Sequence, residues 1–247
     1  MTQPVRFEDI HLERIQRLYS FHQQGLIPTP EKHEVHPELP LGSRENYLYF
    51  TLSCCLNFRR SSVGLWRSAL ATYQDPECRY LFNPTDVMRR DTSQVCGHLF
   101  KYRLAIQVNR HPRIWMAICQ TLAEHYDSDP RNVLAEADFD AGRVIHNLQT
   151  EKRHLFPYLG GRKLSNYWLF ILSRFTDAPL TNVDQISIIP DTNVIKSTVH
   201  LGLADDGVSP QRVEEIWRTV TDQIGLAPIE LHPVLWNWAR NRFTPAV

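Results

Sequence analysis

Two side chains in the second half of the chain have the type and setting needed for covalent chemistry. Lys163 follows a Gly160-Gly161 turn and opens an apolar segment, and Asp191 follows Pro190 at the start of another predicted helix. A lysine amine can attack an electrophilic carbon and form a Schiff base, while a carboxylate can stabilise positive charge or move a proton. Taken singly, such a lysine is usually solvated and such an aspartate usually caps a helix.

The elements that would position these residues are predominantly helical. Apolar residues recur at helical spacing in most segments, and the segment 45–58 is apolar almost all round, which predicts a buried central helix. Short strands are predicted only near Ile186–Ile189. We predict helices over residues 8–24, 45–58, 62–72, 92–108, 112–126, 138–153, 163–175, 192–202, 210–224 and 233–242. The sequence therefore predicts a mostly α fold.

Composition is that of an ordinary soluble protein of 247 residues, with 43% hydrophobic and 22% charged residues. We expect no membrane partner, because no apolar run is long enough to cross a bilayer. The five cysteines are odd in number and form no CxxC pair, which favours an intracellular, reducing compartment. The net charge is zero, but basic residues cluster in four places. These are Arg59 and Arg60; Arg110 and Arg113; Lys152, Arg153, Arg162 and Lys163; and Arg240 and Arg242.

The order of these elements resembles the helix-hairpin-helix and Gly/Pro-rich-Asp signature of the DNA glycosylase superfamily. This superfamily includes endonuclease III and the 8-oxoguanine DNA glycosylases. Its hairpin, L-P-G-[VI]-G-x-K, is followed by [VI]-[PI]-x-D and a helix. Here Gly161 and Lys163 match the end of the hairpin, and Asp191 matches the acid. The resemblance covers roughly Tyr47 to Phe243, with its specific motifs confined to residues 155–202.

The chain departs from the family pattern at several positions. Leu159 stands at the first hairpin glycine, and Lys163 and Asp191 are further apart than in endonuclease III. Asn193 stands where the 8-oxoguanine enzymes usually carry histidine. No cysteine follows Cys119, so the four-cysteine cluster of endonuclease III is absent and no iron–sulfur cluster is expected. The chain therefore resembles the 8-oxoguanine type more closely.

The resemblance implies two helical subdomains that flank a cleft for DNA and the flipped base. We expect an N-terminal helix and connector over residues 1–42, a helical subdomain over 43–135 and a hairpin subdomain over 136–247. It also implies a DNA glycosylase with abasic-site lyase activity, in which Lys163 attacks C1′ and Asp191 stabilises cationic sugar character. The attack needs a neutral amine, which partial burial and the neighbouring cation Arg162 would favour.

The hairpin residues Gly160, Gly161 and Arg162 are expected to hold a DNA phosphate through exposed backbone N–H groups. Asn57 and Arg59, together with Arg60, follow the buried helix where relatives place residues that fill the gap left by the flipped base. Stacking on a flipped base needs aromatic side chains, and Trp66 and Trp238 are also of this type. The candidates for the base pocket are Phe58, Asn193, His200, Trp217 and Trp236.

The expected partner is double-stranded DNA containing a damaged or modified base, bound by a monomer. No metal or cofactor is expected, apart from a structural monovalent cation at the hairpin. The default substrate is 8-oxoguanine, and a hypermodified base of phage DNA, which implies a defence role, is the alternative. Two other hypotheses stay open: a non-catalytic helix-hairpin-helix DNA-binding protein, and a purely hydrolytic glycosylase in which Lys163 is out of reach.

Overall fold

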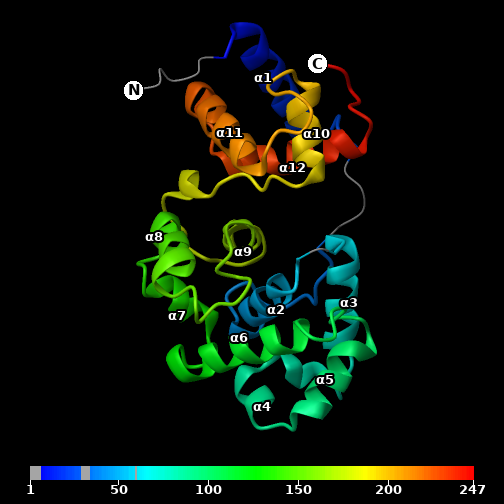
Figure 1. Cartoon of the computed structure of the whole chain (residues 1–247), viewed down its shortest axis with the longest axis vertical. Coiled ribbons are helices and arrows are strands. Elements are labelled where there is room, and N and C mark those ends of the chain that lie inside the picture. The colour runs from blue at the N-terminus through cyan, green and yellow to red at the C-terminus, as the bar shows by residue number, and fades with distance from the viewer. Residues whose placement is uncertain (1–6, 29–33, 59) are drawn as a thin grey trace. The chain divides into compact units, whose positions relative to one another are not determined.

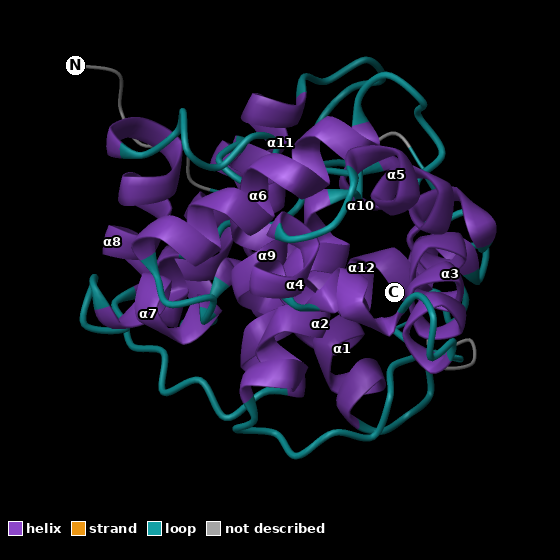
Figure 2. Cartoon of the chain, turned by 90° about the horizontal axis from the view of Figure 1, so that it is seen from below, coloured by secondary structure: helices purple, strands orange, loops and turns teal. Residues whose placement is uncertain are grey.

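The computed structural model describes residues 7–28, 34–58 and 60–247, and most of them are helical (Figure 1). These ranges contain twelve α-helices and no β-strand (Figure 2), so the predicted mostly α class is confirmed. The short strands predicted near Ile186–Ile189 do not form. That segment is buried but has no partner strand among the described residues, and burial without pairing leaves it as irregular chain. None of the described helices is both long and apolar enough to cross a membrane.

The chain divides into two compact units. The terminal unit consists of Met1–Glu31 and Asn182–Val247, and the central unit consists of Lys32–Thr181. This grouping differs from the three predicted segments, because the expected boundary after residue 135 falls inside the central unit. Lys163 belongs to the central unit and Asp191 to the terminal unit.

Four α-helices and a short 3-10 helix enclose the apolar core of the terminal unit. Trp217 and Trp238 are buried in this core, where α10 packs against α12 (Figure 1). The helical elements are α1 (Asp9–Gln23), η3 (Val183–Gln185), α10 (Thr192–His200), α11 (Pro210–Ile224) and α12 (Pro228–Arg240).

Local sequence signals set the ends of the helices in this unit. Ser209 caps α11 by accepting a hydrogen bond from the N–H of Arg212, and Gly225 ends the helix in the left-handed conformation. The last helix begins at Pro228, five positions before the predicted start. Pro233 is the sixth residue of α12, where it removes one backbone hydrogen bond, to the carbonyl of Ile229, without ending the helix.

The central unit is built around α2 (Arg44–Cys55), in which every residue from Asn46 onward is buried. This confirms the prediction of a buried central helix. The indole N–H of Trp168 donates to the hydroxyl of Thr51 at 2.9 Å and so joins α9 to α2. The other helical elements are α3 (Ser62–Gln74), η1 (Arg79–Phe82), α4 (Pro84–Met88), α5 (Thr92–Lys101), α6 (His111–His125), α7 (Pro130–Ala135), α8 (Ala141–His146), the π-helical η2 (Asn147–Glu151) and α9 (Arg162–Phe175).

Two predicted helices of this unit are shorter than expected. The helix predicted over residues 92–108 ends at Lys101, because Arg103 takes a left-handed backbone conformation with φ of 59°. The helix predicted over residues 138–153 is instead α8 followed by the π-helical turn η2. Such turns widen the helix locally and are frequent at functional sites. This one leads directly into the segment that carries the Gly-Gly turn.

Candidate catalytic and DNA-binding site

The Gly-Gly turn is held by its own backbone hydrogen bonds. The N–H of Gly160 donates to the carbonyl of Phe156 at 2.7 Å, and the N–H of Gly161 donates to that of Tyr158 at 2.8 Å. A Cβ on Gly160 would lie 2.5 Å from the carbonyl oxygen of Leu148, so this position requires glycine. The two glycine N–H groups are therefore used inside the turn and do not form the phosphate site expected there.

The donors of this hairpin lie in the first turn of α9. Its N-cap residue is Gly161, which has no side chain to cap the helix. The N–H groups of Lys163 and Leu164 have no acceptor in the described part of the chain. Helix N-termini carry partial positive charge and bind anions through such N–H groups. The N–H donors that a phosphate site needs are therefore those of Lys163 and Leu164 at the start of α9, and not those of the two glycines.

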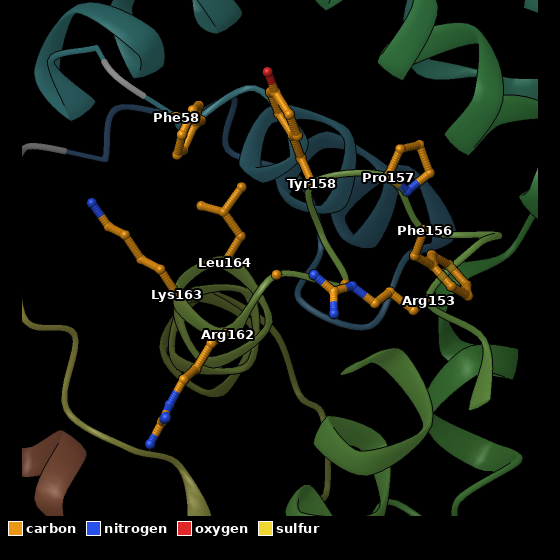
Figure 3. A pocket seen from close by; sticks show the side chains of 10 residues that line it. Phe58, Arg153, Phe156, Pro157, Tyr158, Arg162, Lys163 and Leu164 are labelled. Atoms are coloured by element: carbon orange, nitrogen blue, oxygen red, sulfur yellow. The ribbon is translucent and has the colours of Figure 1, made fainter. Parts of the chain in front are cut away.

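A half-open pocket of about 350 Å³ lies at the start of α9 (Figure 3). Its volume is at the lower end of the roughly 300–1,000 Å³ typical of small-molecule sites. No carboxylate lies among the described residues that line it. Its cationic lining residues are Arg153, Arg162 and Lys163, and its aromatic ones are Phe58, Phe156 and Tyr158. Cations combined with aromatic rings favour an anionic ligand that contains a flat ring system.

Lys163 and Phe58, both predicted site residues, face the same pocket. Figure 3 shows the Lys163 side chain pointing to the side of α9 on which Phe58 lies. The Arg162 side chain points away from Phe58. Lys163 is exposed rather than partly buried, and it forms no ion pair with any described residue. The partial burial expected to favour a neutral amine is therefore not present in this structure.

Tyr158 and Arg153 also line this pocket; sequence analysis placed Arg153 in a basic cluster and did not select Tyr158. The rings of Tyr158 and Phe58 are in contact, with centroids 5.0 Å apart and planes inclined by 52°. The backbone of Tyr158 is left-handed, with φ of 65°, which is uncommon for an aromatic residue. Leu159, which stands at the first hairpin glycine in the resemblance, is fully buried. The only sequence signal for Tyr158 was its place immediately before Leu-Gly-Gly.

The other residues predicted near Phe58 have structural partners. Asn57 is buried, and its side-chain amide exchanges hydrogen bonds with the hydroxyl of Ser62 at 3.1 and 3.2 Å. Arg60 donates to the carbonyls of Leu104 at 2.6 Å and Arg103 at 3.2 Å. Burial, with a smaller contribution from the charge of Arg103, lowers the pKa of Arg60 to about 10.

These two side chains therefore support the fold, and their predicted contacts with DNA have no geometric support. The physical reason is burial: a side chain with internal partners must give them up before it can reach a phosphate. Arg59, the third member of this predicted group, lies outside the described residues.

Asp191 caps α10, as expected for an aspartate that follows a proline. Its Oδ1 accepts hydrogen bonds from the N–H groups of Asn193 and Val194, each at 3.0 Å. Its Oδ2 accepts one from the indole N–H of Trp236 at 2.9 Å. The Arg240 guanidinium lies over the Trp236 ring, 4.6 Å from its centroid. Asp191, Asn193 and Trp236, three predicted site residues, are thus neighbours and are half-buried.

Two predicted base-pocket residues contact other residues of the terminal unit; Trp217 is buried there, whereas His200 is exposed. Trp217 is fully buried, and its indole N–H donates to the hydroxyl of Thr198 at 2.8 Å. His200 stacks on Phe243 at 3.8 Å between centroids, at the end of α10 opposite to Asp191. Trp217 has no exposed face on which a base could stack. About nine residues of helix, at about 1.5 Å each, separate His200 from Asp191.

Two acid-free stretches of the central unit line the pocket, and a third lies beside them. Residues 46–74, 92–123 and 152–176 contain no aspartate or glutamate, although the chain as a whole is neutral. The first stretch contributes Phe58 and the third contributes Tyr158. The second is connected to the first by a hydrogen bond of 3.4 Å from the side chain of Gln107 to the carbonyl of Phe58. A neutral protein thus has a local surface rich in positive charge.

No protein-family model matches the chain, and a search of curated proteins finds no match. The resemblance to the DNA glycosylases therefore rests on the motifs alone. Within the described residues, no group of three or more His, Cys, Asp or Glu side chains is placed to hold a metal ion.

Proposed function

We propose that this protein is a DNA glycosylase that excises a damaged or modified base from duplex DNA and then nicks the abasic strand. The observation that carries the proposal is Lys163: an exposed amine at a helix N-terminus, in an aromatic pocket whose described lining contains no carboxylate. An amine in that setting can meet a nucleotide whose phosphate binds the helix end. The resemblance around Gly161, Lys163 and Asp191 supports the same activity.

The proposed reaction begins when the ammonium group of Lys163 loses a proton to solvent and the resulting amine adds to C1′ of the flipped nucleotide. The glycosidic C1′–N bond breaks and the base leaves with one proton of the amine. The C1′–O4′ bond of the sugar ring then opens to a protonated imine as O4′ takes a proton from water. Loss of a proton from C2′ then expels the 3′ phosphate and nicks the strand. A carboxylate stabilises the cationic sugar while this charge exists, which is the role that the resemblance assigns to Asp191.

Binding of duplex DNA is supported by the charge distribution of the central unit. Phosphate contacts supply affinity without reading sequence, and they need cations that have no carboxylate partners of their own. Arg153 and Lys163 meet this requirement among the described residues. Lys152 does not, because it pairs with Glu136 and donates to the hydroxyl of Tyr126 at 3.1 Å. We propose that the protein acts as a monomer on double-stranded DNA inside the cell.

One observation favours a different class of function, a non-catalytic DNA-binding module. Both carboxylate oxygens of Asp191 already accept hydrogen bonds within the terminal unit, which is sufficient reason for an acid at this position. Under this alternative, Lys163 contacts phosphate only. The two hypotheses differ in one respect that can be measured directly, since only the enzyme releases a base.

The test is base release from duplexes that each carry a single modified base. The panel contains 8-oxoguanine as the proposed substrate, together with uracil, an oxidised pyrimidine and glucosylated hydroxymethylcytosine. We expect release and strand cleavage on one of these duplexes, and release of the glucosylated base would select the defence role. Binding to all duplexes without release from any of them would favour the non-catalytic module.

A further inference from the structure

The turn before α9 contains an aromatic residue where glycine would fit without strain. Tyr158 has a φ of 65°, a conformation in which a Cβ is disfavoured. Two other described aromatic residues, Phe139 and Phe243, have left-handed backbones. Each of them follows a helix and closes it with a backbone hydrogen bond. The N–H of Phe139 donates to the carbonyl of Leu134, and the N–H of Phe243 donates to the carbonyl of Trp238. Tyr158 closes no helix, so its conformation has no such explanation.

This backbone conformation places the Tyr158 ring at the pocket. Tyr158 contacts Phe58, and both rings line the same pocket as Lys163 (Figure 3). Glycine occupies the two nearby positions where a Cβ would meet backbone, but not position 158. A strained residue that is retained where an unstrained one would fit is grounds for a functional hypothesis.

The pocket around these rings has the chemistry of a nucleotide site. Arg153 and Lys163 supply positive charge, and the N–H groups of Lys163 and Leu164 supply donors for a phosphate. The two rings supply a sequence-tolerant surface for a base, because every base has a π face. Their centroid distance of 5.0 Å leaves no room for a base between them, so the base would stack on their outer side.

We infer that Tyr158 and Phe58 form a stacking platform for a nucleobase next to the phosphate bound at the start of α9. This inference rests on the proposed function only for the identity of the ligand as a DNA strand. That the ligand carries a phosphate and a flat base is inferred from the pocket itself. The platform sets the position of a nucleotide relative to Lys163. Tyr158 is therefore a positioning residue, and removing its ring weakens DNA binding without removing the reactive amine.

The experiment uses the full-length protein and a short single-stranded oligonucleotide containing 2-aminopurine, whose fluorescence is quenched by stacking. Tyr158→Gly and Tyr158→Asn remove the ring, and both residues tolerate a left-handed backbone. Tyr158→Phe retains the ring. The matched control is Phe139→Gly, which removes another half-buried, left-handed aromatic residue of the same unit, away from the pocket. Circular dichroism verifies that each variant is folded.

Wild type, Tyr158→Phe and Phe139→Gly should quench the probe and bind with similar affinity. Tyr158→Gly and Tyr158→Asn should lose the quenching and bind about tenfold more weakly, as expected for the loss of one stacked base. Quenching and affinity equal to wild type in both ring-deletion variants would overturn the platform while leaving the proposed enzyme intact. Quenching that depends on Tyr158 in a protein that releases no base would retain the platform and overturn the enzyme. Failure of the wild type to bind the oligonucleotide would overturn the platform, and failure to bind duplex DNA as well would overturn both.

Discussion

Trp236 donates its indole N–H to Oδ2 of Asp191 at 2.9 Å, while Oδ1 of the same carboxylate caps α10. The acid is thus fixed in orientation by one helix and by a side chain of another. A fixed carboxylate with both oxygens engaged can support structure, chemistry or both. Substitutions that retain capping but remove the charge separate these roles.

Asp191→Asn and Asp191→Ser retain a side-chain oxygen that can cap α10, whereas Asp191→Ala removes it. Loss of a cap costs about 0.5–2 kcal/mol, so only the alanine variant should lose that much of its free energy of unfolding. If the carboxylate acts on the sugar, all three variants should lose most of their base release. Chemical denaturation and a base-release assay measure the two effects. Normal base release by Asp191→Asn would contradict the catalytic role.

Gly160→Ala should destabilise the protein by about 1–3 kcal/mol, since its Cβ would lie 2.5 Å from the carbonyl oxygen of Leu148, and backbone cannot move aside cheaply. Gly97→Ala, in the helix α5, is the control: no atom lies within 4 Å of the place that its Cβ would occupy, and alanine is the better helix former. It should stabilise the protein by about 0.5–1 kcal/mol. Equal melting temperatures for the two variants would show that the hairpin does not pack on η2 as described.

His111 should make the protein less stable in mild acid. Burial, with a smaller effect from the charge of Arg60, lowers the pKa of His111 to about 4 from the ordinary value of 6.5. The unfolded chain therefore binds a proton that the folded chain does not, and stability falls as the pH drops from about 6.5 towards 4. Above pH 6.5 His111 is neutral in both states, and the folded state loses no stability to its protonation.

His111→Asn tests this prediction, because an amide oxygen can still accept the hydrogen bond from the N–H of Ile106 but does not titrate. Between pH 7.5 and pH 5 the wild type should lose on the order of 1 kcal/mol more of its free energy of unfolding than the variant. Parallel pH profiles for the two proteins would show that the imidazole takes up its proton over the same pH range in the folded and unfolded states.

Arg153→Gln should weaken binding of any duplex and reduce the slope of log affinity against log salt by about one, as expected for one lost phosphate contact. Arg143→Gln is the matched control, because Arg143 is exposed but pairs with Asp138 at 2.6 Å. Its salt dependence should equal that of wild type. Fluorescence anisotropy at several salt concentrations measures both slopes. An unchanged slope for Arg153→Gln would remove this residue from the DNA-binding surface.

Several helices were predictable because local signals set them. The apolar periodicity of α1 ends at Gly25, which has a φ of 70°, and Ser209 and Asp191 cap helices at the predicted places. The all-apolar pattern of α2 predicted its burial, since such a helix has no face to present to water. Where one residue type fixes the local backbone, the sequence was sufficient to predict where a helix begins or ends.

The candidate site was predictable only in part, because pocket-lining and core residues share the same types. Trp217 and Asn57 matched the chemistry of base recognition, but tertiary packing buries both of them. Tyr158 was missed because its left-handed backbone, with φ of 65°, and its contact with Phe58 are features of the folded chain that no spacing in the sequence encodes. Lys163 and Phe58 were selected and do share a pocket.

The most direct test of the proposed function is reductive trapping by borohydride on duplexes with 8-oxoguanine, another modified base or a plain abasic site. Reduction of the imine would leave a stable protein–DNA complex of lower electrophoretic mobility. The wild type should give this complex, Lys163→Gln should not, and the control Lys196→Gln, at an exposed lysine of α10, should give as much as wild type. A complex that persists in Lys163→Gln, or no complex on any duplex, would contradict the assignment of Lys163 as the nucleophile.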